Sequence, residues 1–335
     1  MRSALPAQSR RPRLRAPLRT LGLGSYSGLT VTEQQLLDQI ARRLPFLRRS
    51  GLVLGPGDDC AIFRPRGSRS DWLITTDLVL EGVHFRPQTH PARAVGHRVL
   101  ARGLSDVAAM GGTPRFCFLS LALAPWAGRR WLDGFLRGFA ALARRFGVIL
   151  AGGDLARSPQ LLCDIIVCGE VPRGEALRRD GARPGDQICV SGQLGGSACG
   201  LRTGRGQAWK RHLYPEPRVA LGRYLREKLG ATAAMDLSDG LSLDLHRMAL
   251  ASGLSAVLER DPPIDPGATL EEALHGGEDY ELLFTIPAAM ALPAAYQGVR
   301  LTRIGVMKEG RRGAVRLGRA ALKPGGYDHF REPPC

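Results

Sequence analysis

The sequence lacks the features that would place it in a membrane or in a secreted, disulfide-bonded class. Its apolar runs all fall short of the roughly 18 residues that a membrane-spanning helix needs. The seven cysteines form no C-x-x-C pair and mostly sit in apolar stretches, which argues against a zinc site and a disulfide framework. Since the sequence has no secretory signal, we expect a cytoplasmic protein that does not span a membrane.

Acidic residues are scarce relative to basic ones. The chain has 47 lysines and arginines against 31 acids, for a formal net charge of +16. Such an excess suggests a polyanionic partner: nucleic acid, a phosphorylated ligand or an acidic surface. Residues 1–28 contain arginines, no acid and no apolar period, so we expect a disordered basic extension there. Nucleic acid is an unfavoured partner because the sequence shows no basic–aromatic interleaving and no known nucleic-acid module.

Apolar spacing after residue 28 predicts helices and strands that alternate along the chain. A helix is predicted over residues 91–110, between a proline at its first position and a Gly-Gly pair. Another is predicted over residues 129–146, where large apolar side chains share one face. Residues 148–151 are predicted to form a buried strand that leads into Gly-Gly-Asp. This mixture indicates an α/β or α+β fold.

The order of these elements predicts two domains. A turn over Arg-Pro-Gly-Asp at residues 183–186 separates one series of strands and helices from the next. We place the boundary near Arg173. The N-terminal domain is then expected over residues 29–172 and the C-terminal domain over residues 173–335.

Aspartates recur where apolar elements end, beside Gly, Ser or Thr. They are Asp58, Asp59, Asp77, Asp106, Asp154, Asp236 and Asp239. Acids at strand ends project into crevices where ligands bind, and glycines let phosphates approach the backbone. If several of these carboxylates converge, only bound cations make their mutual repulsion tolerable. Oxygen ligands, including threonine hydroxyls, suit Mg²⁺, which shares its coordination between carboxylates and substrate phosphates.

The common nucleotide-binding devices are missing. The sequence has no G-x-x-x-x-G-K-[ST] loop and no protein-kinase catalytic set. A nucleotide enzyme with this sequence must therefore use carboxylates and metal ions where those folds use a lysine-bearing loop.

An ordered set of motifs along the chain resembles one known family. The motifs are Gly-Pro-Gly-Asp-Asp-Cys-Ala at 55–61, Thr-Thr-Asp at 75–77, Glu-Gly-Val-His-Phe at 81–85, Leu-Ser-Asp-Val-Ala-Ala-Met-Gly at 104–111, Gly-Gly-Asp at 152–154, Arg-Asp-Gly-Ala-Arg-Pro-Gly-Asp at 179–186, Asp-Leu-Ser-Asp-Gly-Leu at 236–241, Gly-Gly-Glu-Asp-Tyr-Glu-Leu at 276–282 and Gly-Tyr-Asp-His-Phe at 326–330. Together they resemble the thiamine-monophosphate kinases, over about residues 29–330.

The resemblance implies a fold like that of the aminoimidazole ribonucleotide synthetases. An N-terminal α/β domain would dimerise through its strands, giving a homodimer. A C-terminal α/β domain would complete a groove that holds ATP over several Mg²⁺ ions. The implied reaction is direct in-line transfer of the ATP γ-phosphoryl group to thiamine monophosphate. Because the second pKa of a phosphate monoester is about 6, no general base or covalent nucleophile is expected.

By motif position, the resemblance also implies roles for individual residues. The implied metal ligands are Asp59, Thr75, Thr76, Asp77, Asp106, Asp154, Asp236 and Asp239. The implied ATP contacts are Gly153, Arg179 and Ser238. The thiamine-phosphate side is implied to be His84, Glu278 and Tyr327, with Tyr327 able to stack on an aromatic ring. One departure from the family pattern is Leu155-Ala156, where the family usually has threonine.

Two other members of the superfamily remain as alternatives. A selenophosphate synthetase needs a reactive cysteine near the N-terminal glycine loop. Cys60 is close to that position but sits within the kinase pattern. The hydrogenase-maturation enzymes end in cysteine, as this chain does at Cys335. The motifs at residues 278–282 and 327–330 nevertheless fit the kinases better.

Overall fold

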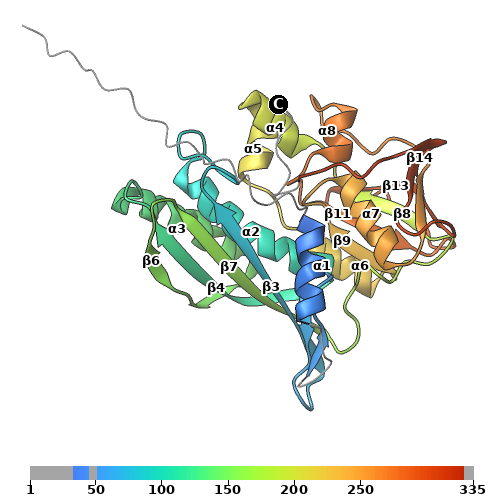
Figure 1. Cartoon of the computed structure of the whole chain (residues 1–335), viewed down its shortest axis with the longest axis horizontal. Helices are drawn as coiled ribbons and strands as arrows, with labels where there is room; N and C mark the ends of the chain where they lie inside the picture. Colours follow the sequence, from blue (N-terminus) through green and yellow to red (C-terminus); the bar gives the residue numbers. More distant parts are fainter. Residues whose placement is uncertain (1–32, 45–50, 328–335) are drawn as a thin grey trace, which may run out of the picture.

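The structure is a computed structural model that describes residues 33–44 and 51–327. Its two sheets lie in two units that meet along helix α2 (Ala92–Ala109) (Figure 1). The expected basic extension over residues 1–28, and Cys335, lie outside the described residues. Within the described residues, no helix combines the length and apolar character that crossing a membrane requires.

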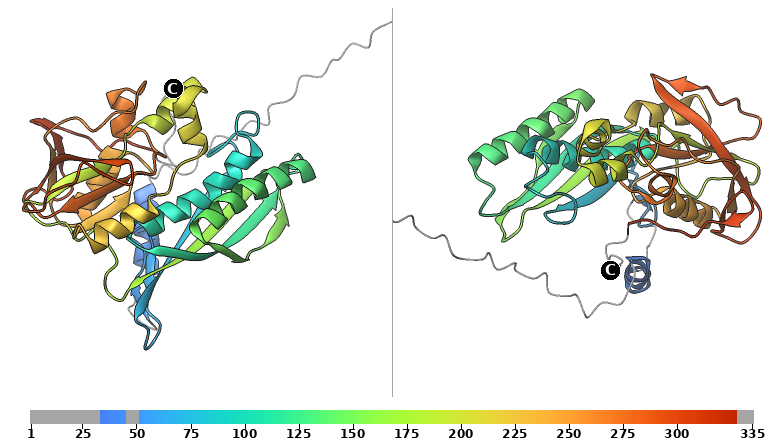
Figure 2. Two further views of the ribbon diagram at one scale, coloured as in Figure 1. Left: turned by 180° about the vertical axis from the view of Figure 1, so that it is seen from behind. Right: turned by 90° about the horizontal axis from the view of Figure 1, so that it is seen from above.

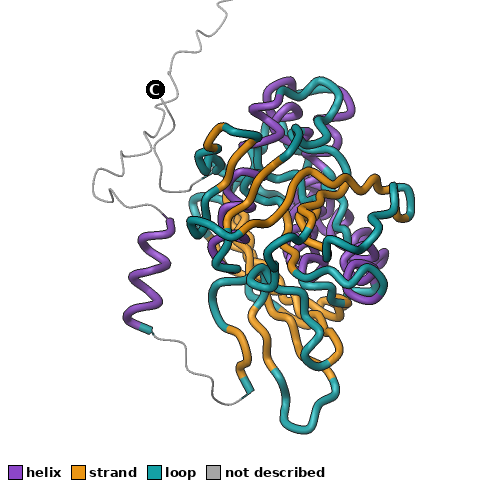
Figure 3. The backbone as a smooth tube through the Cα atoms, turned by 90° about the vertical axis from the view of Figure 1, so that its right-hand side faces the viewer, coloured by secondary structure: helices purple, strands orange, loops and turns teal. Residues whose placement is uncertain are grey.

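The N-terminal unit is a mixed sheet with helices on one face. Its strands run in the order β1-β2-β3-β7-β4-β5, and β6 pairs with β4. The strands are β1 (Leu52–Leu54), β2 (Ala61–Phe63), β3 (Ser70–Leu80), β4 (Thr113–Leu123), β5 (Ile149–Gly152), β6 (Leu155–Arg157) and β7 (Leu162–Pro172). Seen from behind, α2 and α3 (Arg129–Phe146) lie across one face of this sheet (Figure 2). Helix α1 (Glu33–Arg43) lies at the margin of the molecule (Figure 3).

The C-terminal unit contains a second mixed sheet. Its order is β15-β14-β10-β13-β8-β11-β9, with β12 beside β13. The strands are β8 (Gln187–Ser191), β9 (Ala233–Asp236), β10 (Ser255–Leu258), β11 (Leu282–Ile286), β12 (Ala295–Tyr296), β13 (Val299–Lys308), β14 (Val315–Leu317) and β15 (Ala320–Ala321). The helices are α4 (Gly196–Thr203), α5 (Gly206–Leu213), α6 (Val219–Glu227), α7 (Leu241–Ala251) and α8 (Leu270–His275).

Helix α2 is the centre of the molecule because it is buried on nearly every side. Gly96 lets α3 approach closely, since a Cβ there would lie 2.0 Å from the carbonyl oxygen of Phe135. On the other side, Gly222 of α6 approaches α2 in the same way, with Ala108 O 1.9 Å from a built Cβ. Polar side chains on α2 are therefore held rigidly between the two units, where they reach groups on both.

The predicted fold class and the two long helices of the first half are confirmed. Helix α2 falls within the range expected at 91–110, with Pro91 and Met110 as its caps, and α3 matches the range expected at 129–146. Strand β7 ends at Pro172, and the next sheet begins with β8 at Gln187. The prediction of a buried strand at 148–151 is wrong in one respect. Strand β5 forms, but it is exposed throughout because it lies at the end of the sheet.

Candidate active site

Three aspartates from distant parts of the sequence meet where the two units join. Asp59 lies in the loop between β1 and β2, Asp106 in the last turn of α2, and Asp236 at the end of β9. Each offers a carboxylate oxygen, and these oxygens all lie within 4.8 Å of one another. We call Asp59, Asp106 and Asp236 the acid cluster.

Local structure fixes each member of the acid cluster. Strand β9 is buried along its whole length, so packing in the core fixes the position of Asp236 at the end of the strand. The loop that carries Asp59 is tied to the end of α2, because the Cys60 N–H donates to the Sδ of Met110 over 3.1 Å. Ser105 donates its hydroxyl to Asp236 Oδ2 over 2.6 Å, which links α2 directly to β9.

Hydrogen bonds satisfy part of the acid cluster and leave one oxygen without a partner. The Thr75 hydroxyl donates to Asp106, and Arg179 donates from Nη2 to Asp59 Oδ1 over 2.7 Å. Asp59 Oδ2 is buried and finds no hydrogen-bond partner among the described residues. A buried carboxylate oxygen without a donor is costly unless a cation takes its place.

Burial and mutual repulsion make full ionisation of these acids unfavourable. Burial raises the pKa of the Asp236 carboxyl to about 7, and the charge of Asp59 adds to the effect. Burial raises the pKa of Asp58 to about 7 as well, again with help from Asp59 and against the pull of Arg179. The pKa of Asp106 lies well above its usual value, because of burial first and then the charges of Asp77 and Asp236.

The acid cluster therefore fits a divalent cation. Its ligand atoms are all oxygens, they are close enough to share one ion, and one of them lacks any other partner. Hard oxygen sets of this kind suit Mg²⁺. A cation would also remove the repulsion that raises the carboxyl pKa values.

The Thr-Thr-Asp motif divides between the two faces of strand β3. Thr75 and Asp77 lie on the face toward α2, where Asp77 Oδ1 accepts from Arg102 Nη2 over 3.1 Å. Side chains alternate along a strand, so Thr76 points to the other face. There its hydroxyl donates to Asp164 Oδ1 over 2.8 Å. The structure brings Thr75 to the acid cluster but not the side chain of Thr76.

Asp154 stands apart from the acid cluster within one chain. It lies between β5 and β6 and is exposed. The order β3-β7-β4-β6 puts three strand spacings between its strand and that of Asp77, or about 14 Å at ~4.8 Å per spacing. Gly153 has a structural reason to be glycine, since a Cβ there would lie 1.8 Å from the carbonyl oxygen of Leu119.

The Asp-Leu-Ser-Asp-Gly motif forms the turn from β9 into α7. Asp239 pairs with Arg247 of α7. The fully buried Asp244 accepts the backbone N–H groups of Asp239 and Gly240 over 3.2 and 3.0 Å. Sequence reasoning missed Asp244, because an acid inside a helix gives no signal that it supports the preceding turn.

The residues expected on the acceptor side are tied to this turn by backbone hydrogen bonds. The Glu278 N–H donates to Ser238 O over 2.8 Å, and the Tyr327 N–H donates to Asp239 O over 3.3 Å. The structure thus brings Ser238, Glu278 and Tyr327 next to the acid-bearing turn. His84 has a local role, since its Nδ1 accepts the Leu80 N–H over 3.0 Å.

Two arginines of α2 contact Glu278, and sequence reasoning missed both. Arg98 Nη2 lies 2.5 Å from Glu278 Oε1, and Arg102 Nη1 lies 3.7 Å from the same oxygen. Glu278 itself has φ +66°, an uncommon conformation for a residue with a side chain. Isolated arginines on a predicted buried helix offered no motif that would have identified them.

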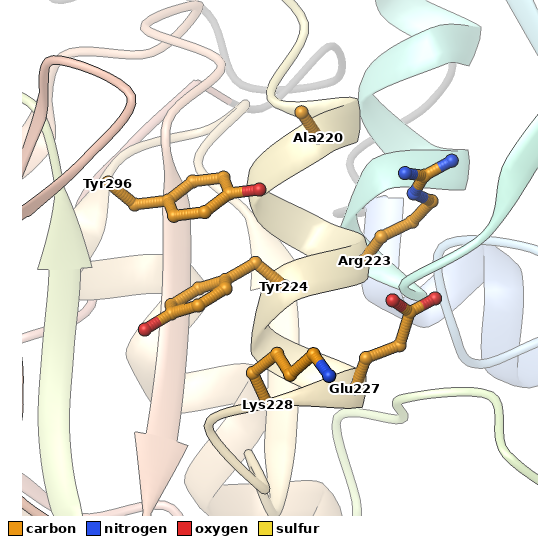
Figure 4. Close-up of a pocket in the computed structure, with 6 residues that line it drawn as sticks. All are labelled: Ala220, Arg223, Tyr224, Glu227, Lys228 and Tyr296. Atoms are coloured by element: carbon orange, nitrogen blue, oxygen red, sulfur yellow. The ribbon is translucent and has the colours of Figure 1, made fainter.

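A hollow elsewhere on the surface is unrelated to these residues. A cavity of about 460 Å³ lies on the C-terminal unit, where Tyr224 of α6 stacks on Tyr296 of β12 with ring centroids 4.1 Å apart (Figure 4). Its lining is Ala220, Arg223, Tyr224, Glu227, Lys228 and Tyr296. It contains none of the predicted site residues, so the chemistry of the side chains locates the candidate site better than cavity size does.

The fold and the acid cluster define a class of protein. The family pattern described as AIR synthase related protein, N-terminal domain, matches residues 57–171. The corresponding pattern for the C-terminal domain matches residues 183–318. The molecule is thus built as a two-domain AIR synthase related protein.

Similar proteins narrow this class. A thiamine-monophosphate kinase of Salmonella typhimurium is 38% identical, over 88% of this chain and 98% of its own length. One of Bacillus subtilis is 30% identical, over 85% and 96%. A structure described as AaThiL complexed with AMPPCP and TMP is 31% identical with a TM-score of 0.78, over 89% of this chain and 97% of that chain. The chain belongs to the thiamine-monophosphate kinase family and is an enzyme of that kind.

The alternatives within the superfamily gain no support. A structure of the hydrogenase maturation protein HypE has a TM-score of 0.64 at 19% identity, over 78% of this chain and 90% of that chain, which shows the common fold alone. Cys60 is 1% exposed. Burial and the neighbouring acids raise the pKa of its thiol well above the usual value. A reactive cysteine needs the opposite environment.

Proposed function

We propose that this chain transfers the γ-phosphoryl group of ATP directly to the phosphate of thiamine monophosphate, giving thiamine diphosphate and ADP. The observation that supports this most is the convergence of the acid cluster, Asp59, Asp106 and Asp236, on one small volume. Family membership supplies the acceptor. The relative described with AMPPCP, an ATP analogue, supports ATP as the donor.

We infer that the acid cluster holds Mg²⁺. The further proposed ligands are Thr75, Thr76, Asp77, Asp154 and Asp239. Thr75 and Asp77 lie on the face of β3 that carries the cluster, which favours them over Thr76. When bound, Mg²⁺ neutralises phosphate charge and orients the transferred group.

We assign the nucleotide to Gly153, Arg179 and Ser238. The assignment of Arg179 is supported by the hydrogen-bond donors of its guanidinium. Its Nη2 donates to Asp59 Oδ1, while its buried Nε makes no hydrogen bond within residues 33–44 and 51–327 and lies 3.4 Å from Asp58 Oδ1 as an ion pair. A guanidinium that still has hydrogen-bonding capacity beside a metal site is well placed to bind a phosphate oxygen. We assign the thiamine-phosphate side to His84, Glu278 and Tyr327.

The proposed reaction is one displacement. An oxygen of the acceptor phosphate attacks the γ-phosphorus, the bond from that phosphorus to the β–γ bridging oxygen breaks, and ADP leaves. The acceptor is largely dianionic above its second pKa of about 6, so no protein group has to remove a proton. The contribution of the chain is to hold two anions in line and to offset their repulsion.

We also propose that the enzyme is a homodimer that uses the open face of the N-terminal sheet. Helices α2 and α3 cover only one face (Figure 2). The other face and its edge expose Leu78, Phe118, Ile149, Leu150 and Leu155. Exposed apolar side chains on an uncovered sheet face are typical of a self-complementary interface.

We place the reaction in the cytoplasm. The described cysteines are buried free thiols, which suits a reducing compartment. Thiol titration of the denatured protein should find all seven cysteines reduced. A disulfide in freshly isolated protein would contradict this assignment.

The proposed function is tested by incubating the full chain with ATP, Mg²⁺ and thiamine monophosphate. Chromatography should show thiamine diphosphate and ADP formed in equal amounts, and unphosphorylated thiamine should not replace the acceptor. Production of AMP, or release of inorganic phosphate without thiamine diphosphate, would refute the proposal.

A further inference from the structure

One arginine connects the acid-bearing strand to the acceptor side of the site. Arg102 Nη2 lies 3.1 Å from Asp77 Oδ1, and Arg102 Nη1 lies 3.7 Å from Glu278 Oε1. Asp77 belongs to the N-terminal sheet and Glu278 to the C-terminal unit. The guanidinium of Arg102 therefore stands between the groups assigned to metal and those assigned to thiamine monophosphate.

Two donors at this place are buried without partners. Across the described ranges, neither Arg102 Nε nor the Tyr280 hydroxyl has a hydrogen-bond partner. Tyr280 is 2% exposed. Buried donors are almost always paired in folded proteins, and an unpaired one needs a specific explanation. Two of them beside a proposed phosphate-transfer site point to an anion that binds them both.

The backbone holds Tyr280 in place at the expense of strain. Tyr280 has φ +51° and Glu278 has φ +66°. Hydrogen bonds from their N–H groups to Leu237 O and Ser238 O, over 3.0 and 2.8 Å, fix both residues against the turn that follows β9. Strained non-glycine residues cluster at active sites, ligand clamps and switch regions.

The two unpaired donors are electrostatic neighbours. Burial raises the pKa of the Tyr280 phenol, and the positive charge of Arg102 is the largest effect that opposes the rise. The phenol is therefore a neutral O–H donor at physiological pH. It lies in the field of a permanently charged guanidinium.

We propose that Arg102 and the Tyr280 hydroxyl bind the phosphate of thiamine monophosphate, an inference that rests on the proposed function. A guanidinium presents a fork of N–H groups that matches two phosphate oxygens, and a phenol adds a third donor. Bound there, the acceptor phosphate lies between Asp77 and Glu278, with the rest of the acceptor on the Glu278 side. Arg102 and Tyr280 are then the residues that distinguish thiamine monophosphate from thiamine.

Tyr280→Phe is the sharpest variant because it removes only the unpaired hydroxyl. Tyr224→Phe, on the surface of α6, is the matched control. Calorimetry would use thiamine monophosphate and unphosphorylated thiamine as separate probes. Tyr280→Phe should weaken the binding of thiamine monophosphate about tenfold to a hundredfold, as expected for one lost hydrogen bond to a charged group. Binding of thiamine should not change, and the melting temperature should stay the same or rise because no partner of the hydroxyl is left unsatisfied.

Arg102 provides the second arm of the test. Arg102→Met should weaken the binding of thiamine monophosphate by about tenfold or more and remove the preference for it over thiamine. Arg102→Lys, which keeps the charge and loses the fork, should fall between Arg102→Met and the wild type. Steady-state kinetics should show these losses in the KM for thiamine monophosphate and leave the KM for ATP nearly unchanged.

Two results would overturn the assignment. In the first, Tyr280→Phe binds thiamine monophosphate as the wild type does. In the second, Arg102→Met raises the KM for ATP and leaves the KM for thiamine monophosphate unchanged. Arg102 would then only support Asp77. Assays of the wild-type chain in parallel distinguish failure of this assignment from failure of the proposed function. If it makes thiamine diphosphate while the variants bind normally, only this assignment fails. If it neither binds nor converts thiamine monophosphate, both fail.

Discussion

The stability of the metal-free protein should fall as pH rises through the range in which the buried acids ionise. For Asp236, burial raises the pKa from 3.8 to about 7. Because the pKa is higher in the folded state, the folded protein binds this proton more tightly than the unfolded chain does. The contribution of the Asp236 carboxyl to the free energy of unfolding is therefore fully present below pH 4 and is lost as pH rises toward 7.

The size of the effect follows from the shift. A rise of about three units corresponds to roughly 4 kcal/mol at most for Asp236. For a domain of 150–250 residues, 1 kcal/mol moves the melting temperature by about 2–4 °C. About two of these three units fall between pH 5 and pH 7, so in EDTA the wild type should lose roughly 3 kcal/mol, or about 5–10 °C, between pH 5 and pH 8 through this group alone. Mg²⁺ should restore most of the loss at pH 8 and little at pH 5.

Thermal melting of the wild type and Asp236→Asn, with and without Mg²⁺, provides the measurement. The asparagine variant cannot ionise, so its melting temperature in EDTA should depend on pH much less than that of the wild type. Titrating groups remote from the acid cluster are the same in both proteins and cancel in the comparison. Asp106 does not cancel, because the charge of Asp236 helps to raise its pKa and is absent from the variant. If both proteins show the same pH dependence, or if metal-free wild type is more stable at pH 8 than at pH 5, the reasoning about the acid cluster is wrong.

Three further predictions concern the site and the assembly. Asp106→Asn should nearly abolish turnover while the protein stays folded, because it removes a central member of the acid cluster. Full wild-type turnover in excess EDTA would contradict the metal requirement on which this expectation rests. Tyr327→Ala should raise the KM for thiamine monophosphate several-fold, since stacking adds about 0.5–1.5 kcal/mol, and steady-state kinetics that show a weakened KM for ATP instead would reverse the assignment. Ile149→Glu on the open sheet face should shift the sedimentation mass from a dimer toward the 36.2 kDa chain, and an unchanged dimer would exclude that face as the interface.

The sequence predicted best what depends on local pattern. The helices over 91–110 and 129–146 follow from apolar spacing and from their Pro and Gly boundaries. Motif order placed Asp59, Asp106 and Asp236 in one site, although they lie far apart along the chain. The structure does bring these three together.

What the sequence did not predict depends on side-chain direction and on contacts between units. Strand alternation turns Thr76 away from Thr75, and a motif read as a string does not show this. The exposed position of Asp154 follows from strand order, which places both β5 and β6 beside β4 at one end of the sheet. Arg102 gave no signal in the sequence, and Tyr280 lay within the motif at 276–282 without a role of its own. Their significance lies in unpaired donors that only three-dimensional packing reveals.

The central claim is direct transfer of the γ-phosphoryl group from ATP to thiamine monophosphate. A single-turnover experiment with enzyme in excess over γ-³²P-labelled ATP tests it most directly. Rapid quenching should show the label passing from ATP to the terminal phosphate of thiamine diphosphate, with no labelled protein at any time. Label that first accumulates on the protein, or that appears in inorganic phosphate while thiamine monophosphate remains unchanged, would contradict the account.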